Sequence, residues 1–491
     1  MESRLLSATR APSLSQRAIN VALSLEPRLE PARWYVLALF FWLTASQCLV
    51  WFTFSSVPST VIEYYCDLPP SACALAPGSA AVPKGCSCAA MSTGVVDQLL
   101  NWGPLTFVPT VPFVSWMLTF PGGLRRTMRL AAVLTFLATL LRLLPSVALT
   151  KAQRQHPSAL LLLHAAQILN GIAGPVLIAG PSRLSALWFA PRQRATVTAA
   201  ANASFFGAAI GFYAGPALTM GDPQNVPRML YATLGTATVP LLCALLYCPD
   251  RPSSAPSAAV VSDDAKRDKS TVAFFRGAAA TLRQTPSMFL LMAITGLSIG
   301  VYDTWIGVLP QILRSYPPQF AANPTLAGTA GAIHTFACIL GMWTAGIAAD
   351  KLFARRYKAL LLAALTTAAL CFAWVVLSVG DNIWLKGWTP LPSTTLSLFV
   401  AVALVGFLRT STVPILYELG AEMTYPQPEG TSAGMIVIAE HATLLTALFI
   451  APRVDVSYVS LATLVALAIS PILALFISEE YKRSDAERGG V

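Results

Sequence analysis

Long apolar blocks alternate with short polar connections along most of the chain. Each block is long enough to cross a bilayer, because a hydrocarbon core about 30 Å thick requires about 20 helical residues. The blocks are continuously apolar, and an open sheet cannot satisfy its edge in lipid, so membrane-spanning strands are excluded. Twelve helical spans are predicted, at approximately 34–57, 95–120, 130–149, 158–181, 195–220, 229–248, 287–313, 324–349, 359–379, 396–416, 431–451 and 457–477.

A long polar stretch near the middle of the chain divides these spans into two sets of six. The pattern therefore predicts an all-α polytopic membrane protein with twelve transmembrane helices in two six-helix halves. The predicted parts are a tail at 1–33, a first half at 34–248, a linker at 249–286, a second half at 287–478 and a tail at 479–491.

The linker begins with a run of Pro, Ser and Ala and continues with mixed charges, a composition typical of a flexible tether. Its last part, residues 271–283, has two interpretations. It forms a short amphipathic helix with Phe274 and Phe275 against the membrane, or it is a disordered part of the tether.

Composition and charge support the membrane assignment. Hydrophobic residues make up 55% of the chain and charged residues 11%, whereas a soluble domain has roughly a quarter charged residues. The net charge of +10 comes largely from Lys and Arg in the short connections, where basic residues act as orientation signals. A nucleic-acid partner is therefore not expected, and the expected surroundings are the lipid bilayer.

The distribution of basic residues predicts the orientation. With the N-terminus in the cytosol, Lys and Arg are more numerous in the inner connections than in the outer ones, so both tails and the linker are predicted to be cytosolic. The exception is the inner connection at 420–430, which is acidic and has no base. No compact apolar core precedes the first span, so no cleavable signal peptide is expected.

This orientation places the loop at 59–93 outside the cytosol, and the loop holds four of the nine cysteines, Cys66, Cys73, Cys86 and Cys88. Two disulfides are expected there, with three possible pairings. A metal site is the alternative, but a CxC pair without a nearby His or second close pair is a weak signal, and no metal is expected. The cysteines within spans are interpreted as small packing residues.

The seventh span carries the densest set of embedded polar and aromatic side chains. Tyr302, Asp303 and Trp305 lie within one turn, between Gly300 and Pro310. Gly and Pro permit local unwinding, and transporters form sites at broken helices between their halves.

An organic cation can stack on aromatic rings, and Trp51 of the first span is the candidate partner for Tyr302. Asp303 would then supply a negative charge. The alternative is that Trp51 and Trp305 are packing or interfacial aromatics and that Asp303 lies near the outer surface.

Other embedded polar residues have both a functional and a structural interpretation. Glu440 and His441 lie deep in the eleventh span, either for proton coupling or as a static hydrogen-bonded pair. Gln167 and Asn170 share one face of the fourth span, for ligand binding or for helix packing.

Two cations lie within or close to spans. Arg142 is expected to extend outward, and Arg409 to face the cavity or to pair with an acid. An acidic cluster at an inner helix end, made of Glu418, Glu422 and Glu429, is expected to form a gating latch with Arg side chains of another inner loop.

Motifs of energy-coupled and metal-dependent enzymes are missing from the sequence. It contains no phosphate-binding GxxxxGK[ST] loop, no HExxH motif and no paired CxxC motifs, so an enzyme is not expected and no cofactor is predicted. Four His residues leave little for haem coordination.

Two six-helix halves with basic inner turns resemble the major facilitator superfamily. Its signature after the second helix of each half matches here, in the second half, at Gly346, Asp350, Lys351, Arg355 and Arg356. The resemblance implies a gating role for Asp350 and Arg355. The first-half copy, FPGGLRR at 120–126, has Phe120 where an acid would be expected.

More specific stretches resemble solute carrier family 49, which contains the feline leukaemia virus subgroup C receptor proteins and a lysosomal "disrupted in renal carcinoma" member. They are WGPLTFVP at 102–109, QILNGIAGP at 167–175, PSRLSALWF at 181–189 and TYPQPEGTSAG at 424–434. The resemblance implies alternating access around a central site. By motif position it implies an aromatic cage of Trp51 and Tyr302, His441 at an amide position, and Trp305 as a Trp of the lysosomal member.

The expected function is transport of a small organic solute, cationic or aromatic and vitamin-like, for example pyridoxine, by a monomer. The alternatives are choline, ethanolamine or haem transport, as the receptor-like members imply, and a non-transporting membrane receptor or sensor. The expected location is the plasma membrane or a lysosome-like organelle.

Overall fold

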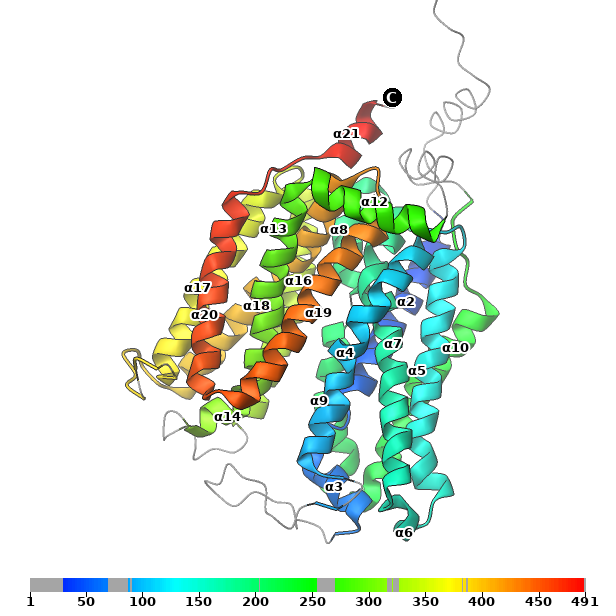
Figure 1. Cartoon of the computed structure of the whole chain (residues 1–491), viewed down its shortest axis with the longest axis vertical. Helices are drawn as coiled ribbons and strands as arrows, with labels where there is room; N and C mark the ends of the chain where they lie inside the picture. The colour runs from blue at the N-terminus through cyan, green and yellow to red at the C-terminus, as the bar shows by residue number, and fades with distance from the viewer. Residues whose placement is uncertain are drawn as a thin grey trace, which may run out of the picture.

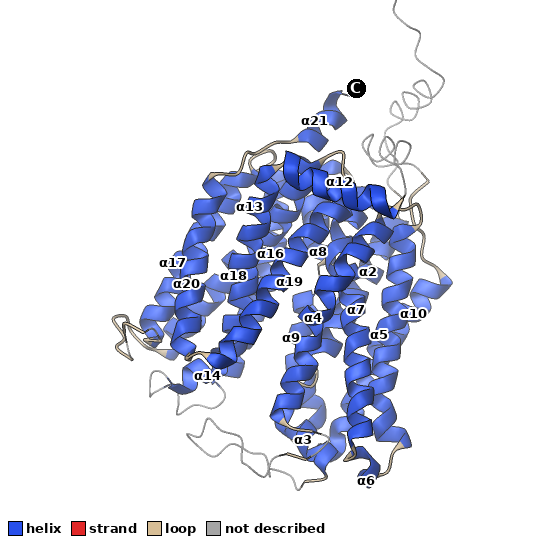
Figure 2. Ribbon diagram, in the orientation of Figure 1, coloured by secondary structure: helices blue, strands red, loops and turns tan. Residues whose placement is uncertain are grey.

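The computed structural model describes residues 30–68, 87–88, 91–202, 204–253, 270–315, 320, 326–381, 383–385 and 387–489. Within these residues the regular structure is entirely helical (Figure 2). The long helices form two groups that lie side by side with their axes roughly aligned (Figure 1).

The first group contains the helices α2 (Ala32–Phe52), α4 (Thr93–Leu118), α5 (Gly123–Ala148), α7 (Pro157–Trp188), α8 (Arg194–Ala201), α9 (Ser204–Thr219) and α10 (Val226–Leu246). The second contains α13 (Pro286–Thr295), η3 (Gly296–Val301), α14 (Tyr302–Ser315), α16 (Leu326–Lys351), α17 (Tyr357–Val379), α18 (Thr395–Thr424), α19 (Glu429–Ile450) and α20 (Val456–Leu475). Further helices lie at the ends of these groups or connect their members: α3 (Pro58–Cys66), α6 (Lys151–Arg154), η1 (Pro191–Gln193), η2 (Pro223–Asn225), α12 (Thr271–Gln284), η4 (Ala451–Arg453) and α21 (Lys482–Gly489).

Eleven helices in the described part of the chain are long and apolar enough to cross a membrane. The remaining long helix, α4, has 26 residues, but it carries Asp97, Gln98, Asn101 and three prolines. It packs against α19 of the second group, so part of its surface faces protein instead of lipid. The arrangement confirms the predicted all-helical polytopic fold.

Several spans differ from their predicted form. The fifth is split into α8 and α9 around Asn202, where the backbone leaves the helical region. In the seventh, Gly296–Val301 forms a π-helix, a wider turn that often occurs at functional sites, instead of an unwound segment. Residues 271–283 lie in helix α12, as the amphipathic interpretation predicted.

Helices α7 and α18 extend well past their predicted ends, to Trp188 and Thr424. The predicted spans end just before charged residues such as Arg183 and Glu418, because an unpaired charge is costly in lipid. Both residues are buried here among polar partners, which removes the reason to end the helix.

The apolar cores show how the two groups meet. One core cluster combines residues of both groups, for example Phe107 and Leu118 of the first with Leu291 and Ile436 of the second. It lies toward the end of the molecule that carries α12 and α21, called here the α12 end (Figure 1).

At the opposite end, called here the α3 end, each group has its own core. Phe54 and Leu163 belong to the core of the first group, and Trp305 and Val402 to that of the second. The two groups diverge toward this end in Figure 1. They therefore share a core at one end and are separately packed at the other.

Candidate substrate site and gate

The boundary between the shared and the separate cores is marked by Phe107 of α4 and His441 of α19. Their rings stack with centroids 4.2 Å apart and planes inclined by 18°. Closer to the α12 end, Gly434 of α19 lies against Ser115 and Val111 of α4. Between Phe107 and the α3 end, no hydrogen bond, ion pair or ring contact joins the two groups among the described residues.

Trp51 extends this aromatic contact into the first group. Its ring lies 5.9 Å from that of Phe107, and its indole N–H donates to the Leu100 carbonyl at 2.8 Å. The ring lies over Gly103, where an added Cβ would come within 2.1 Å of a ring carbon. Gly103 is therefore the residue that permits this position of Trp51.

Phe107 was not predicted as a site residue. It is fully buried, and its ring lies over Gly174 of α7, where an added Cβ would be 2.1 Å away. An apolar ring has no polar group that would distinguish a site residue from a core residue. Phe107 and Gly174 do, however, fall within the stretches at 102–109 and 167–175 that resemble solute carrier family 49.

Gln167 and Asn170 hold α7 against α2. The Gln167 amide donates to the Trp51 carbonyl at 3.2 Å, and the amides of Gln47 and Asn170 each donate to the other's backbone carbonyl at 3.1 Å. The side-chain oxygens of Gln167 and Asn170 are buried without a hydrogen-bond partner within the described structure. Their N–H groups thus serve packing, while two side-chain acceptors between α7 and α2 remain unused.

The second group places Asp303 and Arg409 together. Asp303 Oδ1 lies 3.1 Å from Arg409 Nη1, and the guanidinium lies over the Tyr302 ring at 4.8 Å. The Tyr302 hydroxyl is 3.4 Å from His334 Nδ1. Of the two alternatives predicted for Arg409, facing the cavity or pairing with an acid, the ion pair with Asp303 confirms the second.

Tyr302 and Trp305 are both buried inside the second group. Trp305 packs on Phe372 and donates its indole N–H to Ser460 Oγ at 3.0 Å, and the Ser460 hydroxyl donates to Asp381. No ring contact joins Trp51 to Tyr302 among the described residues. The two predicted cage residues, one in each half, therefore do not meet in this conformation.

Glu440 and His441 point in different directions from α19, as adjacent helical residues must. His441 Nδ1 lies 3.0 Å from the Val437 carbonyl and 4.0 Å from Glu440 Oε1. His441 is buried against Phe107, whereas the Glu440 side chain keeps 16% of its surface exposed. Glu440 interacts electrostatically with Asp303 and Arg409, so the structure brings these three charged groups to one region.

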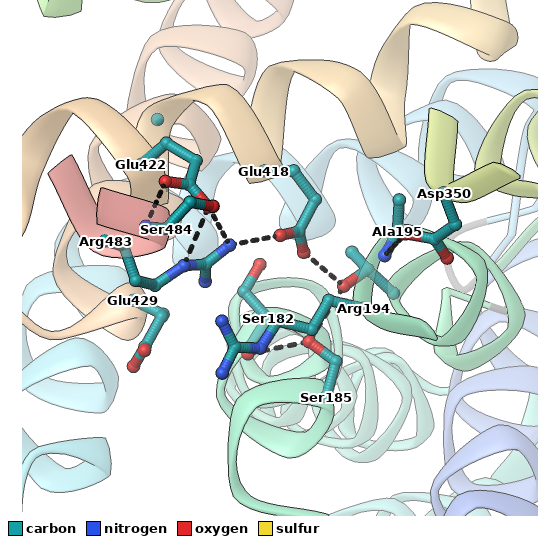
Figure 3. Close-up of polar contacts among 12 residues, drawn as sticks. Ser182, Ser185, Arg194, Ala195, Asp350, Glu418, Glu422, Glu429, Arg483 and Ser484 are labelled. Carbon is teal, nitrogen blue, oxygen red and sulfur yellow. Dashed lines mark hydrogen bonds and ion pairs between the residues drawn. The ribbon is translucent and has the colours of Figure 1, made fainter. Parts of the chain in front are cut away.

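At the α12 end, polar contacts join the two groups (Figure 3). Asp350 of α16 accepts the backbone N–H groups of Ala195 at 3.1 Å and Thr196 at 2.7 Å, at the start of α8. A carboxylate is favourable there, because the first N–H groups of a helix lack helical partners. Arg183 pairs with Glu429 at 3.2 Å.

The acidic cluster has a partner that was not predicted. Arg483 of the C-terminal tail lies 2.6 Å from Glu418 Oε2 and 3.0 Å from Glu422 Oε1. Burial works against the charged form of Arg483, but the two carboxylates outweigh it and raise the pKa of the guanidinium. The expected Arg from another inner loop is present only for Glu429, and Arg355 pairs instead with Asp485 at 2.6 Å.

Asp250 completes the FPGGLRR turn from a distant part of the sequence. Asp250, which follows α10, accepts hydrogen bonds from the N–H groups of Gly122 at 2.8 Å and Arg125 at 3.2 Å, and so supplies the acid that the FPGGLRR turn lacks at Phe120.

The outward position expected for Arg142 is wrong. Its guanidinium is buried over the Phe54 ring at 3.8 Å, a favourable cation–π contact.

A disulfide joins Cys66 at the end of α3 to Cys88, with Cα atoms 5.6 Å apart. Cys73 and Cys86 lie outside the described residues, so their pairing stays a prediction. Within the described structure no cluster of His, Cys, Asp and Glu side chains could hold a metal ion.

Comparisons with known proteins agree with this architecture. A sequence profile described as Major Facilitator Superfamily matches residues 89–447. The chain is 30% identical over 431 residues to the solute carrier family 49 member 4 homolog of Xenopus laevis, covering 84% of this chain and 82% of that protein. It is 24% identical over 477 residues to the choline/ethanolamine transporter flvcr2a of Danio rerio, covering 94% of this chain and 90% of that protein.

A solved structure supports the fold alone. The proton:xylose symporter XylE bound to 6-bromo-6-deoxy-D-glucose superposes with a TM-score of 0.58 at 13% sequence identity, covering 92% of this chain and 99% of that chain.

Proposed function

Because the chain belongs to the Major Facilitator Superfamily, it is a multi-pass secondary transporter and not an enzyme, and we propose that its substrate is a small organic cation or aromatic, vitamin-like solute such as pyridoxine. The site proposed for this substrate lies where the shared core ends, between Trp51 and Phe107 on one side and Glu440 on the other.

The observation that carries this proposal is the pairing of charges around Glu440. Asp303 is compensated by Arg409, and His441 carries no charge when neutral, so an ionised Glu440 leaves the site with one unbalanced negative charge. Such a site favours a monovalent cation over an anion. The ring of Trp51 adds cation–π attraction, worth roughly 0.5 to 2 kcal/mol.

The unused oxygens of Gln167 and Asn170 support a substrate with hydrogen-bond donors. Both are buried, Gln167 next to the Trp51 backbone and Asn170 next to the Gln47 backbone, and both accept no hydrogen bond from the described residues. A hydroxyl or ammonium group at this position would satisfy them, which removes the cost of a buried polar group without a partner.

The polar contacts that join the two groups at the α12 end fit a gate that opens and closes during alternating access. We propose that the α12 end is cytosolic, as the charge distribution predicts, so that in the conformation described the halves are joined on the cytosolic side and separately packed on the opposite side. Transport then requires the contacts of Asp350 and Glu429 with the first half to break. Tyr302 would approach the first half as the α3 ends close.

Transport of choline or ethanolamine is the second candidate, because the Danio rerio relative is named as a transporter of both. A non-transporting receptor is the alternative of another class. Uptake by proteoliposomes of pyridoxine, choline, ethanolamine and haem separates these candidates.

Wild type, Trp51→Ala and the control Trp388→Ala should be compared, since Trp388 is exposed in a loop. We expect saturable uptake of one cationic or aromatic solute, reduced roughly 2- to 30-fold by Trp51→Ala and unchanged by Trp388→Ala. Absence of saturable uptake of every solute would favour the receptor, and uptake indifferent to Trp51→Ala would remove this residue from the site.

A further inference from the structure

The C-terminal helix α21 contacts both halves of the transporter. Arg483 binds Glu418 and Glu422 of α18 in the second half, whereas Glu487 pairs with Arg194 at the start of α8 in the first half, at 2.8 Å. A helix of only 8 residues therefore connects the two halves across the closed α12 end (Figure 1).

The contacts on the side of the second half are buried. The side chains of Arg483, Glu418 and Glu422 are exposed by 3%, 1% and 3%, so this charge cluster is largely removed from water. One guanidinium faces two carboxylates there, which leaves a net negative charge. A further negative charge in the same place would be strongly unfavourable, because buried charges are screened little.

Ser484 lies directly in this cluster (Figure 3). Its backbone N–H donates to Glu422 Oε2 at 2.9 Å, and its hydroxyl donates to Glu422 Oε1 at 2.9 Å. The hydroxyl is therefore both a tie between α21 and α18 and a position where an added negative charge would face the Glu422 carboxylate.

We propose that Ser484 is a phosphorylation site, and that its modification releases α21 and unlocks the α12 end. A protein kinase transfers the γ-phosphoryl group of ATP to Ser484 Oγ. The new P–O bond replaces the bond to the β-phosphate, ADP leaves, and the hydroxyl proton passes to the kinase base. The product carries about −1.5 to −2 charge at pH 7 and can no longer donate to Glu422.

The sequence around Ser484 indicates the class of kinase. Asp485 follows Ser484 directly and Glu487 stands three residues after Ser484, so the acceptor has acidic residues on its C-terminal side. This pattern suits a kinase whose substrate groove is basic. Ser484 is half-buried when α21 is docked, so the kinase acts on α21 while it is transiently undocked.

Release of α21 removes a specific set of ties. Arg194 loses Glu487, and Glu418 and Glu422 lose their cation, whereas the contacts of Arg183 with Glu429 and of Asp350 with α8 remain. The closed α12 end is then weakened but not abolished. Phosphorylation would thus shift the balance toward the conformation open at the α12 end.

The test measures the conformation directly and does not depend on the substrate. Spin labels at Arg126→Cys and Leu352→Cys, exposed positions of the two halves at the α12 end, report their separation in the purified full chain. The samples are unmodified protein, protein treated with an acid-directed Ser/Thr kinase and ATP, and the variants Ser484→Glu, Ser484→Ala and Glu487→Gln.

Kinase treatment and Ser484→Glu are expected to shift the distance distribution to longer values, and Glu487→Gln to shift it in the same direction. Ser484→Ala is expected to keep the short distance, and kinase treatment of this variant should add no phosphate at this site. The proposal is overturned if Ser484 of the wild-type chain accepts no phosphate, or if the phosphorylated protein keeps the distance of the unmodified one.

Discussion

Asp303 of α14 and Arg409 of α18 form an ion pair with an N···O distance of 3.1 Å, in which Arg409 is fully buried while Asp303 keeps 26% of its side-chain surface exposed. The two partners are thus unequal. Asp303 has access to solvent, whereas Arg409 depends on its surroundings for compensation of its charge.

Neutralising Asp303 should therefore destabilise the second half. We expect Asp303→Asn to lower the free energy of unfolding by about 3 to 5 kcal/mol, because it leaves a buried cation without its partner. Thermal unfolding in detergent measures this effect. The double variant Asp303→Asn, Arg409→Leu should recover part of the loss, and equal stability of the single variant and wild type would contradict the pairing.

Glu440 is expected to link transport to protons. An inward proton gradient should change the rate of substrate uptake by wild-type proteoliposomes, and Glu440→Gln should remove this dependence on the gradient. His441→Gln is the matched control on the adjacent residue, and it should keep the dependence if Glu440 alone carries the proton. A gradient effect that survives in Glu440→Gln would assign coupling to another group.

Substitution of Gly103 should act on the substrate through Trp51. The Cβ of Gly103→Ala would lie 2.1 Å from a ring carbon of Trp51, so the ring must move. We expect a substrate KM raised to a similar extent as in Trp51→Ala. Gly235→Ala in α10 is the control, because its Cβ would meet no atom within 4 Å; a KM unchanged by Gly103→Ala would show that the ring position is unimportant.

The loop residue Asp381 should make stability depend on pH. Burial raises the pKa of its carboxyl from 3.8 to about 6, although the hydrogen bond from Ser460 opposes the shift. A raised pKa in the folded state means that the stabilisation is present below pH 4 and is lost as the pH rises through about 6.

Asp381→Asn removes this titration and should be more stable than wild type at pH 7.5, by up to about 3 kcal/mol. The difference should vanish near pH 4, where the wild-type carboxyl is protonated. Unfolding curves of both proteins across this pH range test the sign, and a wild type that gains stability toward pH 7.5 relative to the variant would reverse it.

The apolar pattern predicted the helical fold because burial in lipid demands long continuous helices, a rule that acts locally along the chain. The same locality explains the failures. Asp250 completes a turn more than a hundred residues earlier in the sequence, and Arg483 completes an acidic cluster from the C-terminal tail. No spacing rule connects such residues, because only the packed structure brings them together.

Individual site residues differed in how far their chemistry revealed their place. Arg409 could be predicted to find an acid, since a buried charge requires compensation. Arg142 satisfies the same requirement with an aromatic ring and a backbone carbonyl, which the sequence does not single out. Phe107 stands at the junction of the halves, yet its side chain is chemically indistinguishable from any core phenylalanine.

The sharing of a core at one end only has a thermodynamic consequence. When the halves rock, opening the α12 end hydrates part of the shared core. Closing the α3 end removes water from the surfaces of the two halves that are separate in the present conformation. Hydration of apolar surface raises the heat capacity and its removal lowers it, so the two changes oppose each other. The change in heat capacity between the states should therefore be small, so the enthalpy and the entropy of the transition should vary little with temperature.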